Sequence, residues 1–355
     1  MQYSQVHKDK RLPARTIISG NLRTPELLRE AIGGSGVKFI GPNTGYAPDD
    51  VLTELDEVFY PEFDYLGSPT MINAEDEVFF KQKSLNRGAY KTEEFLPATK
   101  WETHAEEEEV KVSVIRLANA KTHTVVNYKK ALKIPVEFWE DDQHDVVVRA
   151  IESMARKARI TKDATALRKY ADGFSAETTS DGAAVFSNSH TAIGGDTIDN
   201  LETGVFNASN LEVLVRSLRK QKDQAGDPGL QDIKGLLVAL NLIEDSIEVT
   251  DSELKAHVTD NTLNVFRSNK YPSIEKLGTS IHLHSDFMPD LANVNTSYYA
   301  VSRNHSLSRW VRLQMATNLV DYKFDDFDRY TYKGRYREIT SWIGWEGAAA
   351  SSGTV

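Results

Sequence analysis

Cysteine is absent from this chain of 355 residues. Its absence excludes disulfide bonds, thiolate nucleophiles and cysteine-ligated zinc, and it suits a reducing compartment. Long apolar runs are absent too, since no segment approaches the roughly 18 apolar residues that a membrane-spanning helix needs. The N-terminus has no apolar stretch of the kind found in secretory signal peptides. We therefore expect no contact with a membrane and no secretion by a signal peptide.

Positive charge is in short supply as well. The chain has 42 lysines and arginines against 52 aspartates and glutamates, which gives a net charge of −10 at pH 7. Neutralising phosphates requires clustered lysine and arginine, so this balance argues against a dedicated DNA-binding surface. It is compatible with a protein that merely encloses nucleic acid, because an acidic surface limits sticking to packed DNA.

The sequence also lacks the local signatures of enzymes. The glycines near 33–41 lack both the Lys-Ser/Thr of a P-loop and the spacing of a dinucleotide fingerprint. The run 173–176 lacks the final glycine of a nucleophile elbow. The residues of a Ser–His–Asp triad need not be close in sequence, but no local signature in this chain indicates such a triad. We therefore predict that the protein is not an enzyme, with no catalytic residue and no cofactor.

One stretch has the residue types of a metal site, namely His282, His284 and Asp286. Alternate residues of a strand share a face, so the two imidazoles and the carboxylate can converge on one ion. No distant further ligand is indicated, and we interpret the stretch as polar residues on an exposed strand. The acidic residues and histidine at 141–144 are better explained by helix capping. We predict no metal ligand, with a metal-dependent enzyme as an alternative.

The first half of the chain combines an irregular start with a hairpin. The first 60 or so residues offer one helix candidate, 24–32, with Thr24 as N-cap. Such an arm suits a segment that orders by lying across a neighbour. Residues 77–81 and 111–117 are typical of strands and predict an extended hairpin, which alone is marginal in water. The four glutamates at 106–109 we interpret as a solvated loop face.

The middle of the chain predicts the longest helix, from 141 to about 171. Val147, Ile151 and Met154 recur at three- and four-residue steps and form one apolar stripe. The stepping resumes with an offset through Ile160 and Ala164. Gly173 is expected to end the helix, and the polar segment that follows it marks a connection and a domain boundary.

The second half predicts further helices and strands. Ser209 and Glu212 form a capping box that opens a helix. The glycines and proline at 226–229 predict a turn. Residues 236–240 predict a buried strand, and 242–249 a helix or turn. The sequence predicts strands of a second sheet in three later segments: 298–302, 310–313 and 330–336.

Within this region, the passage 185–238 has a distinctive order of elements. A short hydrophobic piece, a Ser-His turn and a glycine pair precede an Asp-Asn-Leu step, an amphipathic helix and an apolar strand. These pieces occupy, in order, 185–186, 187–190, 194–195, 199–201, 209–228 and 236–238. His190 is interpreted as a turn residue that bonds the backbone rather than as a base. The passage resembles one found in tailed-phage major capsid proteins of the HK97-like fold, and the Trp/Gly-rich ending at 342–348 resembles the close of those chains.

The resemblance implies an α+β fold with the parts of that family. In order, these are an N-terminal arm (1–65), an extended β-hairpin called the E-loop with flanking strands (66–122), a P domain with a long spine helix (123–204), an A domain (205–290), and P-domain closing strands with the C-terminus (291–355). The spine helix corresponds to the long helix predicted at 141–171.

The same resemblance implies a function. It is that of a major capsid protein, which self-assembles into hexamers and pentamers that form an icosahedral head around a double-stranded DNA phage genome. The implied partners are other copies, portal and scaffolding or decoration proteins, and DNA enclosed without sequence specificity. The implied location is the virion capsid, assembled in the host bacterial cytoplasm. No scaffolding-like extension precedes the arm, so we expect any scaffold to be a separate or removed segment.

Two further classes of protein remain as alternatives beside the metal-dependent enzyme. An encapsulin-like nanocompartment has the same fold and encloses cargo enzymes, so the fold does not separate it from a phage head. A phage tail or baseplate protein is disfavoured by the long internal helix. The sequence offers no basis for assigning a covalent Lys–Asn crosslink between subunits.

Overall fold

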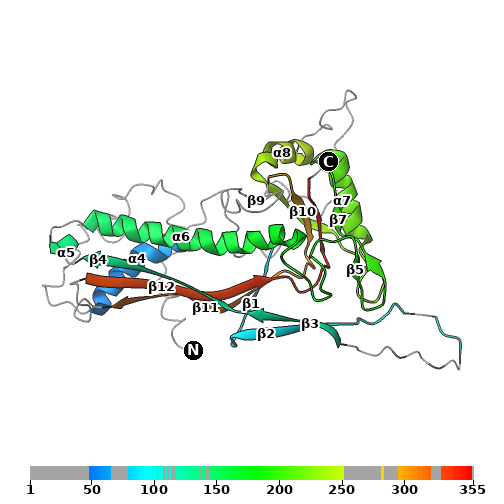
Figure 1. The fold of residues 1–355 in the computed structure, drawn as a ribbon, viewed down its shortest axis with the longest axis horizontal. Coiled ribbons are helices and arrows are strands. Elements are labelled where there is room, and N and C mark those ends of the chain that lie inside the picture. The colour runs from blue at the N-terminus through cyan, green and yellow to red at the C-terminus, as the bar shows by residue number, and fades with distance from the viewer. Residues whose placement is uncertain are drawn as a thin grey trace.

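The computed structural model describes residues 48–64, 79–101, 103–106, 109, 112, 117–135, 137–140, 144–251, 281–283, 295–320 and 329–353. Over these residues the chain is a mixed α+β protein with a four-stranded and a five-stranded sheet. One long helix runs beside the first sheet, and the second sheet lies in a lobe at one end of it (Figure 1). The helix predicted at 24–32 lies outside the described residues. No helix in the described part is both long and apolar enough to span a membrane.

The four-stranded sheet, here called the long sheet, has the order β1-β11-β12-β4. Its strands are β1 (Lys81–Ser84), β4 (Val126–Pro135), β11 (Ser308–Val320) and β12 (Arg329–Ser341). β1 runs parallel to β11, and the other pairs are antiparallel. The strands predicted at 310–313 and 330–336 are confirmed and are longer than expected.

Three helices accompany the long sheet: α4 (Pro48–Asp64), the single-turn α5 (Glu137–Glu140) and α6 (His144–Ala171). Phe59 of α4 and Ile151 of α6 pack with Tyr332 of β12 in one apolar cluster. Since alternate residues of a strand point to opposite faces, α4 and α6 both cover the face that carries the even-numbered residues of β12. The opposite face of the long sheet is left without a helix among the described residues.

The long helix predicted from the apolar stepping is confirmed as α6, but its buried stripe differs from the prediction. Ile160 and Ala164 are only half-buried, whereas Arg159 and Asp163 are buried. These two side chains form an ion pair of 2.9 Å. The stripe therefore continues without an offset because a charged pair occupies two of its positions.

A second buried arginine completes this charged layer between α6 and the long sheet. The Arg309 guanidinium donates to the Lys162 carbonyl oxygen at 3.2 Å. It also lies 3.9 Å from an Asp163 oxygen and 4.0 Å from a Glu338 oxygen. Burial raises the pKa of Asp163 and of Glu338, while the arginines oppose that rise. Charge pairing, rather than apolar packing alone, joins the middle of α6 to the sheet.

The five-stranded sheet, here called the short sheet, has the order β7-β13-β10-β8-β9. Its strands are β7 (Leu201–Glu202), β8 (Ile233–Ala239), β9 (Ile281–Leu283), β10 (Tyr298–Ser302) and β13 (Ala348–Ser351). The strands predicted at 236–240 and 298–302 are confirmed. Residues 291–355 thus supply strands to both sheets.

Two α-helices flank the short sheet, α7 (Ala208–Lys220) and α8 (Ile243–Asp251). Two single 3-10 turns, η2 (Asp172–Phe174) and η3 (Leu240–Leu242), adjoin longer helices. The buried side of α7 is formed by Leu211, Leu214, Val215 and Leu218. The predicted N-cap was wrong: Asn207 caps α7 by accepting from the Asn210 backbone N–H at 2.8 Å, while Ser209 lies inside the helix.

Gly173 marks the end of the long helix for a different reason than the sequence suggested. It is not among the glycines with positive φ, so it is not a left-handed cap. A Cβ at Gly173 would lie 2.8 Å from the Phe186 ring. Glycine is therefore needed here for close packing of Phe186, which lies in the segment that leads to β5 (His190–Thr191) and β6 (Thr197–Ile198).

A separate antiparallel hairpin is formed by β2 (Ala89–Phe95) and β3 (Leu117–Thr124). The sequence predicted an extended hairpin in this region but paired the wrong strands. Residues 81–84 pair with β11 instead, and Leu117 is the only residue of the predicted 111–117 strand that lies in β3. The pair of β2 and β3 nearest their connection is Phe95↔Leu117. The connecting residues 96–116, only some of which the structure describes, are here called the excursion.

Candidate functional site

The surroundings of the hairpin are the candidate functional site, because charged and aromatic side chains gather where β2 and β3 join the body. Lys121 of β3 donates to Glu177 Oε1 at 2.8 Å and to the Trp342 carbonyl oxygen at 3.0 Å. Lys169 at the end of α6 donates to the other Glu177 oxygen at 2.7 Å. Ser341 at the end of β12 also donates to Glu177. One carboxylate therefore holds the hairpin, the long helix and the long sheet together.

The electrostatics of this junction favour the ionised carboxylate. Burial acts to raise the pKa of Glu177, but the hydrogen bonds and charges of Lys121 and Lys169 outweigh it and lower the pKa to about 2. Burial lowers the pKa of Lys121, and Glu177 opposes that change. The pair is charged at neutral pH, as expected for a hydrogen-bonded ion pair that is shielded from water.

A second contact between the hairpin and the body of the protein is made by His123, two positions after Lys121 in β3. His123 Nε2 lies 2.7 Å from the Thr92 hydroxyl across the hairpin, and its ring lies 4.5 Å from the Trp310 ring. Burial lowers the pKa of His123 to about 4, so the imidazole is neutral at pH 7. Trp310 also packs with Leu85 and Val125. The hairpin root thus covers one end of the long-sheet face that the helices leave open.

The third junction is a buried carboxyl on β2. Glu94 follows a register shift in the hairpin. Its carboxyl group lies against Gly344, and any side chain at position 344 would overlap the Glu94 Oε1 atom. Gln224 donates to Glu94 Oε2 at 3.4 Å. Burial raises the pKa of Glu94 to about 7, and the nearby Glu346 carboxyl adds to the rise. The root of the hairpin therefore combines a fixed ion pair with a carboxyl that titrates near neutral pH.

His190, in the passage that resembles capsid proteins, is a buried structural residue. Its Nδ1 lies 2.9 Å from Asp181 Oδ2 and its Nε2 lies 3.1 Å from the Val185 carbonyl oxygen. Its ring stacks on Trp345. Both ring nitrogens face acceptors, so neither is placed to accept a proton from a nucleophile. The bond to the Val185 carbonyl agrees with the predicted backbone role, and the Asp181 carboxylate was not foreseen.

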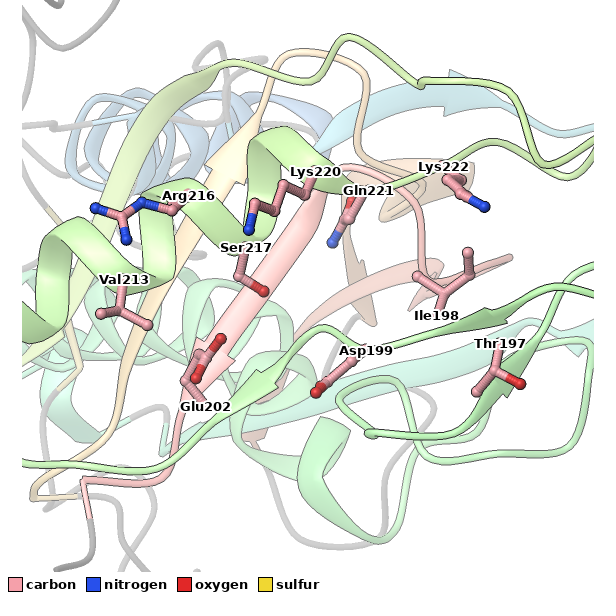
Figure 2. Close-up of a pocket in the computed structure, with 10 residues that line it drawn as sticks. All are labelled: Thr197, Ile198, Asp199, Glu202, Val213, Arg216, Ser217, Lys220, Gln221 and Lys222. Carbon is pink, nitrogen blue, oxygen red and sulfur yellow. The ribbon is translucent and has the colours of Figure 1, made fainter.

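An open cleft of ≈ 400 Å³ lies between α7 and the β6–β7 segment (Figure 2). Arg216, Lys220 and Lys222 line one side, and Asp199 and Glu202 line the other (Figure 2). None of the ten described residues that line it is a histidine. Arg216 and Lys222 are already paired, with Glu212 and Asp196. The cleft has the mixed charge of an ordinary surface rather than convergent catalytic groups.

The predicted metal candidate is only partly described. His282 lies in β9, where its backbone pairs with Val238 of β8, and His284 and Asp286 lie outside the described residues. Of the cluster at 141–144, only His144 is described, as the first residue of α6. No group of three histidine, aspartate or glutamate side chains suited to a metal ion occurs in the described part of the chain.

The junction residues themselves were missed by sequence reasoning. Lys121, Glu177 and Glu94 are separated by up to 83 positions, and no local motif connects them. Their only sequence signal is that Lys121 and His123 alternate on one side of a strand and so reach the same face. The partner of each side chain depends on how the hairpin lies on the body.

No protein-family model matches the chain, and no curated protein is similar to it in sequence. Solved structures are similar in fold. The virus-like particle from Pyrococcus furiosus matches 84% of this chain and 98% of its own, with a TM-score of 0.50 and 8% identity. A structure of Microbacterium phage Oxtober96 matches 81% and 93%, with a TM-score of 0.48 and 10% identity. The capsid of Staphylococcus phage Andhra matches 79% and 84%, with a TM-score of 0.47 and 7% identity.

The likeness to the Pyrococcus furiosus chain extends over nearly all of that chain and shows that the two have the same fold. The predicted α+β class is thereby confirmed, and the structural neighbours have the HK97-like fold that the sequence resemblance implied.

Proposed function

We propose that this protein is a structural shell protein, a phage major capsid protein that assembles with copies of itself into a closed head. The observation that carries the proposal is the capsid fold combined with a hairpin that exposes apolar side chains. Trp101 is 100% exposed, Val112 84% and Leu117 66%. Exposed apolar groups gathered on one projecting segment are typical of a surface that a partner covers.

The proposed parts follow the family division. The hairpin β2–β3 with its excursion corresponds to the E-loop, α6 to the spine helix, and the short-sheet lobe to the A domain. The A domain in this proposal also includes β10 and β13, which were assigned to 291–355 on sequence. Hexamers and pentamers would form because a heterologous contact repeated around an axis closes into a ring. The role in this proposal is mechanical and needs no catalytic group.

The first test is electron microscopy of the chain expressed alone, with light scattering on the same sample. We expect rings, tubes or closed shells of tens of nanometres. A variant that lacks residues 96–116, with an Asn-Gly turn joining Phe95 to Leu117, keeps the strand pairing of the hairpin. It should keep the melting temperature of the parent but form no shell. Normal shells from this variant would contradict the role given to the hairpin.

The contents of the particles separate a genome-enclosing head from an encapsulin-like compartment. We expect shells purified from infected or lysogenic cells to contain double-stranded DNA that resists nuclease until the shell is opened. A defined protein cargo in place of DNA would favour the compartment and would leave the shell role itself intact.

A further inference from the structure

The hairpin of β2 and β3 contains one irregularity in its strand pairing. Glu93 is paired with Ala120, but the next residue, Glu94, is paired with Ala118. Asn119 lies between the two partners and is therefore the extra residue of a β-bulge in β3. A bulge bends its strand and increases the local twist. The direction of the hairpin beyond this point consequently depends on the bulge.

The backbone of Asn119 has a conformation that few residue types adopt. Its φ is 47°, in the left-handed region. Asparagine visits this region more readily than most residues, whereas a β-branched residue there is a genuine outlier. The Asn119 side chain is exposed, so it is not required to fill the core. The backbone conformation of the bulge, rather than packing, therefore explains why asparagine suits this position.

The hairpin is fastened to the body of the protein on both sides of the bulge. On one side, Lys121 donates to the Glu177 carboxylate at 2.8 Å. On the other side, the Glu94 carboxyl lies against Gly344. We call these two contacts the inner and the outer clamp. Because both clamps hold the hairpin to the body, the bend at Asn119 cannot straighten without breaking one of them.

The two clamps reach different parts of the protein. Glu177 is also bound by Lys169 at the end of α6 and by Ser341 at the end of β12. Gly344 lies between β12 of the long sheet and β13 of the short sheet. Figure 1 shows the hairpin leaving the long sheet and extending below the short-sheet lobe. The clamps therefore fix the direction of the hairpin relative to both sheets.

We propose that the bulge at Asn119, held between Lys121 and Glu94, aims the hairpin, and that the direction of the hairpin sets the diameter of the shell. The proposal rests on the shell function proposed above and names the residues that determine its geometry. The rotation between neighbouring copies decides how an assembly closes. A contact carried on a projecting hairpin changes this rotation when the hairpin changes direction. A hairpin of variable direction would accordingly give particles of several diameters.

The direction of the hairpin can be measured in the full-length chain without assembly. Because the chain has no cysteine, spin labels can be attached at Leu117→Cys in the hairpin and Lys133→Cys in β4, both at exposed positions. Double electron–electron resonance gives the distribution of distances between the labels. Asn119→Val should shift or widen this distribution, because a β-branched residue does not hold the left-handed conformation. Asn119→Gly should leave it unchanged, since glycine adopts that conformation readily.

A second pair of variants tests the inner clamp. Lys121→Met removes the clamp, while Glu177 keeps its hydrogen bond from Lys169. This variant should widen the distance distribution. Lys91→Met is the matched control, because Lys91 belongs to the same hairpin but pairs only with Glu93 at the surface. The control should give the distribution of the parent chain.

The diameter of the particles is measured by electron microscopy of the same variants without labels. The parent, Asn119→Gly and Lys91→Met should form shells with one narrow distribution of diameters. Asn119→Val and Lys121→Met should form shells whose spread of diameters is at least about twice that of the parent, because the rotation between copies then varies. A loss of stability alone would lower the melting temperature and the yield of shells but would not change their diameter.

Each measurement has a result that would overturn part of the proposal. An unchanged distance distribution in Asn119→Val would refute the aiming role of the bulge, whether or not the chain assembles. Altered distances with shells of the parent diameter, or with no shells at all, would refute the link between hairpin direction and diameter. A parent chain that never assembles would refute the shell function, while the label distances would still decide the role of the bulge.

Discussion

The two sheets of this protein are built from the same kinds of strand but are buried to different degrees. Every residue of β10 and β13 is buried, and β8 is buried at all but one position. In β12, exposed or half-buried residues alternate with buried ones over most of the strand. The short sheet is thus a core in its own right, whereas the long sheet has one covered face and one open face.

This difference in burial is already visible in the sequences of the strands. A strand buried on both faces has a near-continuous apolar sequence, as in β10, and a half-covered strand alternates, as in β12. Strands β8, β10 and β13 of the short sheet are buried on both faces. The long-sheet lobe is held partly by buried charges, and among the described residues no helix covers its second face.

The largest expected effect comes from breaking the charged layer under the long sheet. Arg309→Met leaves Glu338 and Asp163 with less positive charge in a buried place. We expect the free energy of unfolding at pH 7 to fall by about 4 kcal/mol, the usual cost of removing one partner from a buried ion pair. Urea unfolding followed by tryptophan fluorescence measures it.

The pH dependence of this variant separates charge from packing. The loss should shrink as the pH falls, since protonated carboxyls no longer need the arginine. Arg335→Met, on the exposed face of the same sheet, is the matched control and should change stability little. A loss in Arg309→Met that stays constant down to acid pH would mean that packing against Phe80, and not charge, is what the arginine supplies.

A smaller effect is expected from the apolar core of the short sheet. Leu237 of β8 is fully buried, and Leu237→Ala should lower the free energy of unfolding by about 3 kcal/mol through lost burial and a cavity. Unlike the loss in Arg309→Met, this loss should not depend on pH. Lys333→Ala on the open face should cost almost nothing. Similar losses for Leu237→Ala and Lys333→Ala would refute the contrast between the two sheets.

Sequence reasoning succeeded where local pattern determines structure. The apolar run of β8 and the stepping of α6 predicted those elements, since burial on both faces of a strand leaves a continuous apolar run and burial of one helix stripe leaves a period of three to four residues. The strand β10 was predicted from alternation, although the structure buries it on both faces. It failed where distant residues decide. Nothing near Arg159 and Asp163 reveals that Arg309 and Glu338 lie opposite them, and periodicity alone does not show that residues 81–84 pair with β11 rather than within a hairpin.

The beginning of α7 is a case in which two local signals compete, and it can be tested directly. Asn207→Ala removes the side chain that caps the Asn210 N–H, and should cost about 1 kcal/mol in unfolding free energy. Ser209→Ala removes the cap that the sequence predicted and should cost far less. Thermal unfolding of the two variants compares them. The reverse order of costs would restore the capping box and contradict the observed helix start.

The smallest expected effect lies at the hairpin root, where two carboxyls of the long-sheet lobe have opposite pH dependence. The pKa of Glu94 is raised to about 7, so its contribution to hairpin docking is full below the ordinary pKa and is lost as pH rises toward 7. The pKa of Glu177 is lowered to about 2, so its contribution is present at neutral pH and is lost only in strong acid.

Glu94→Gln removes the titrating group and keeps its shape. At pH 8 the substitution should raise the opening free energy of the β2 and β3 amides, measured by hydrogen exchange, by about 1 kcal/mol or less relative to the parent. The effect is small because the site is in partial contact with solvent. At pH 5 the two chains should be alike. Glu93→Gln, on the exposed neighbour, is the control and should change neither value. If the parent hairpin is equally protected at pH 5 and pH 8, the ionisation of Glu94 does not affect hairpin docking. The stability of the hairpin root would then depend on the Lys121–Glu177 pair alone.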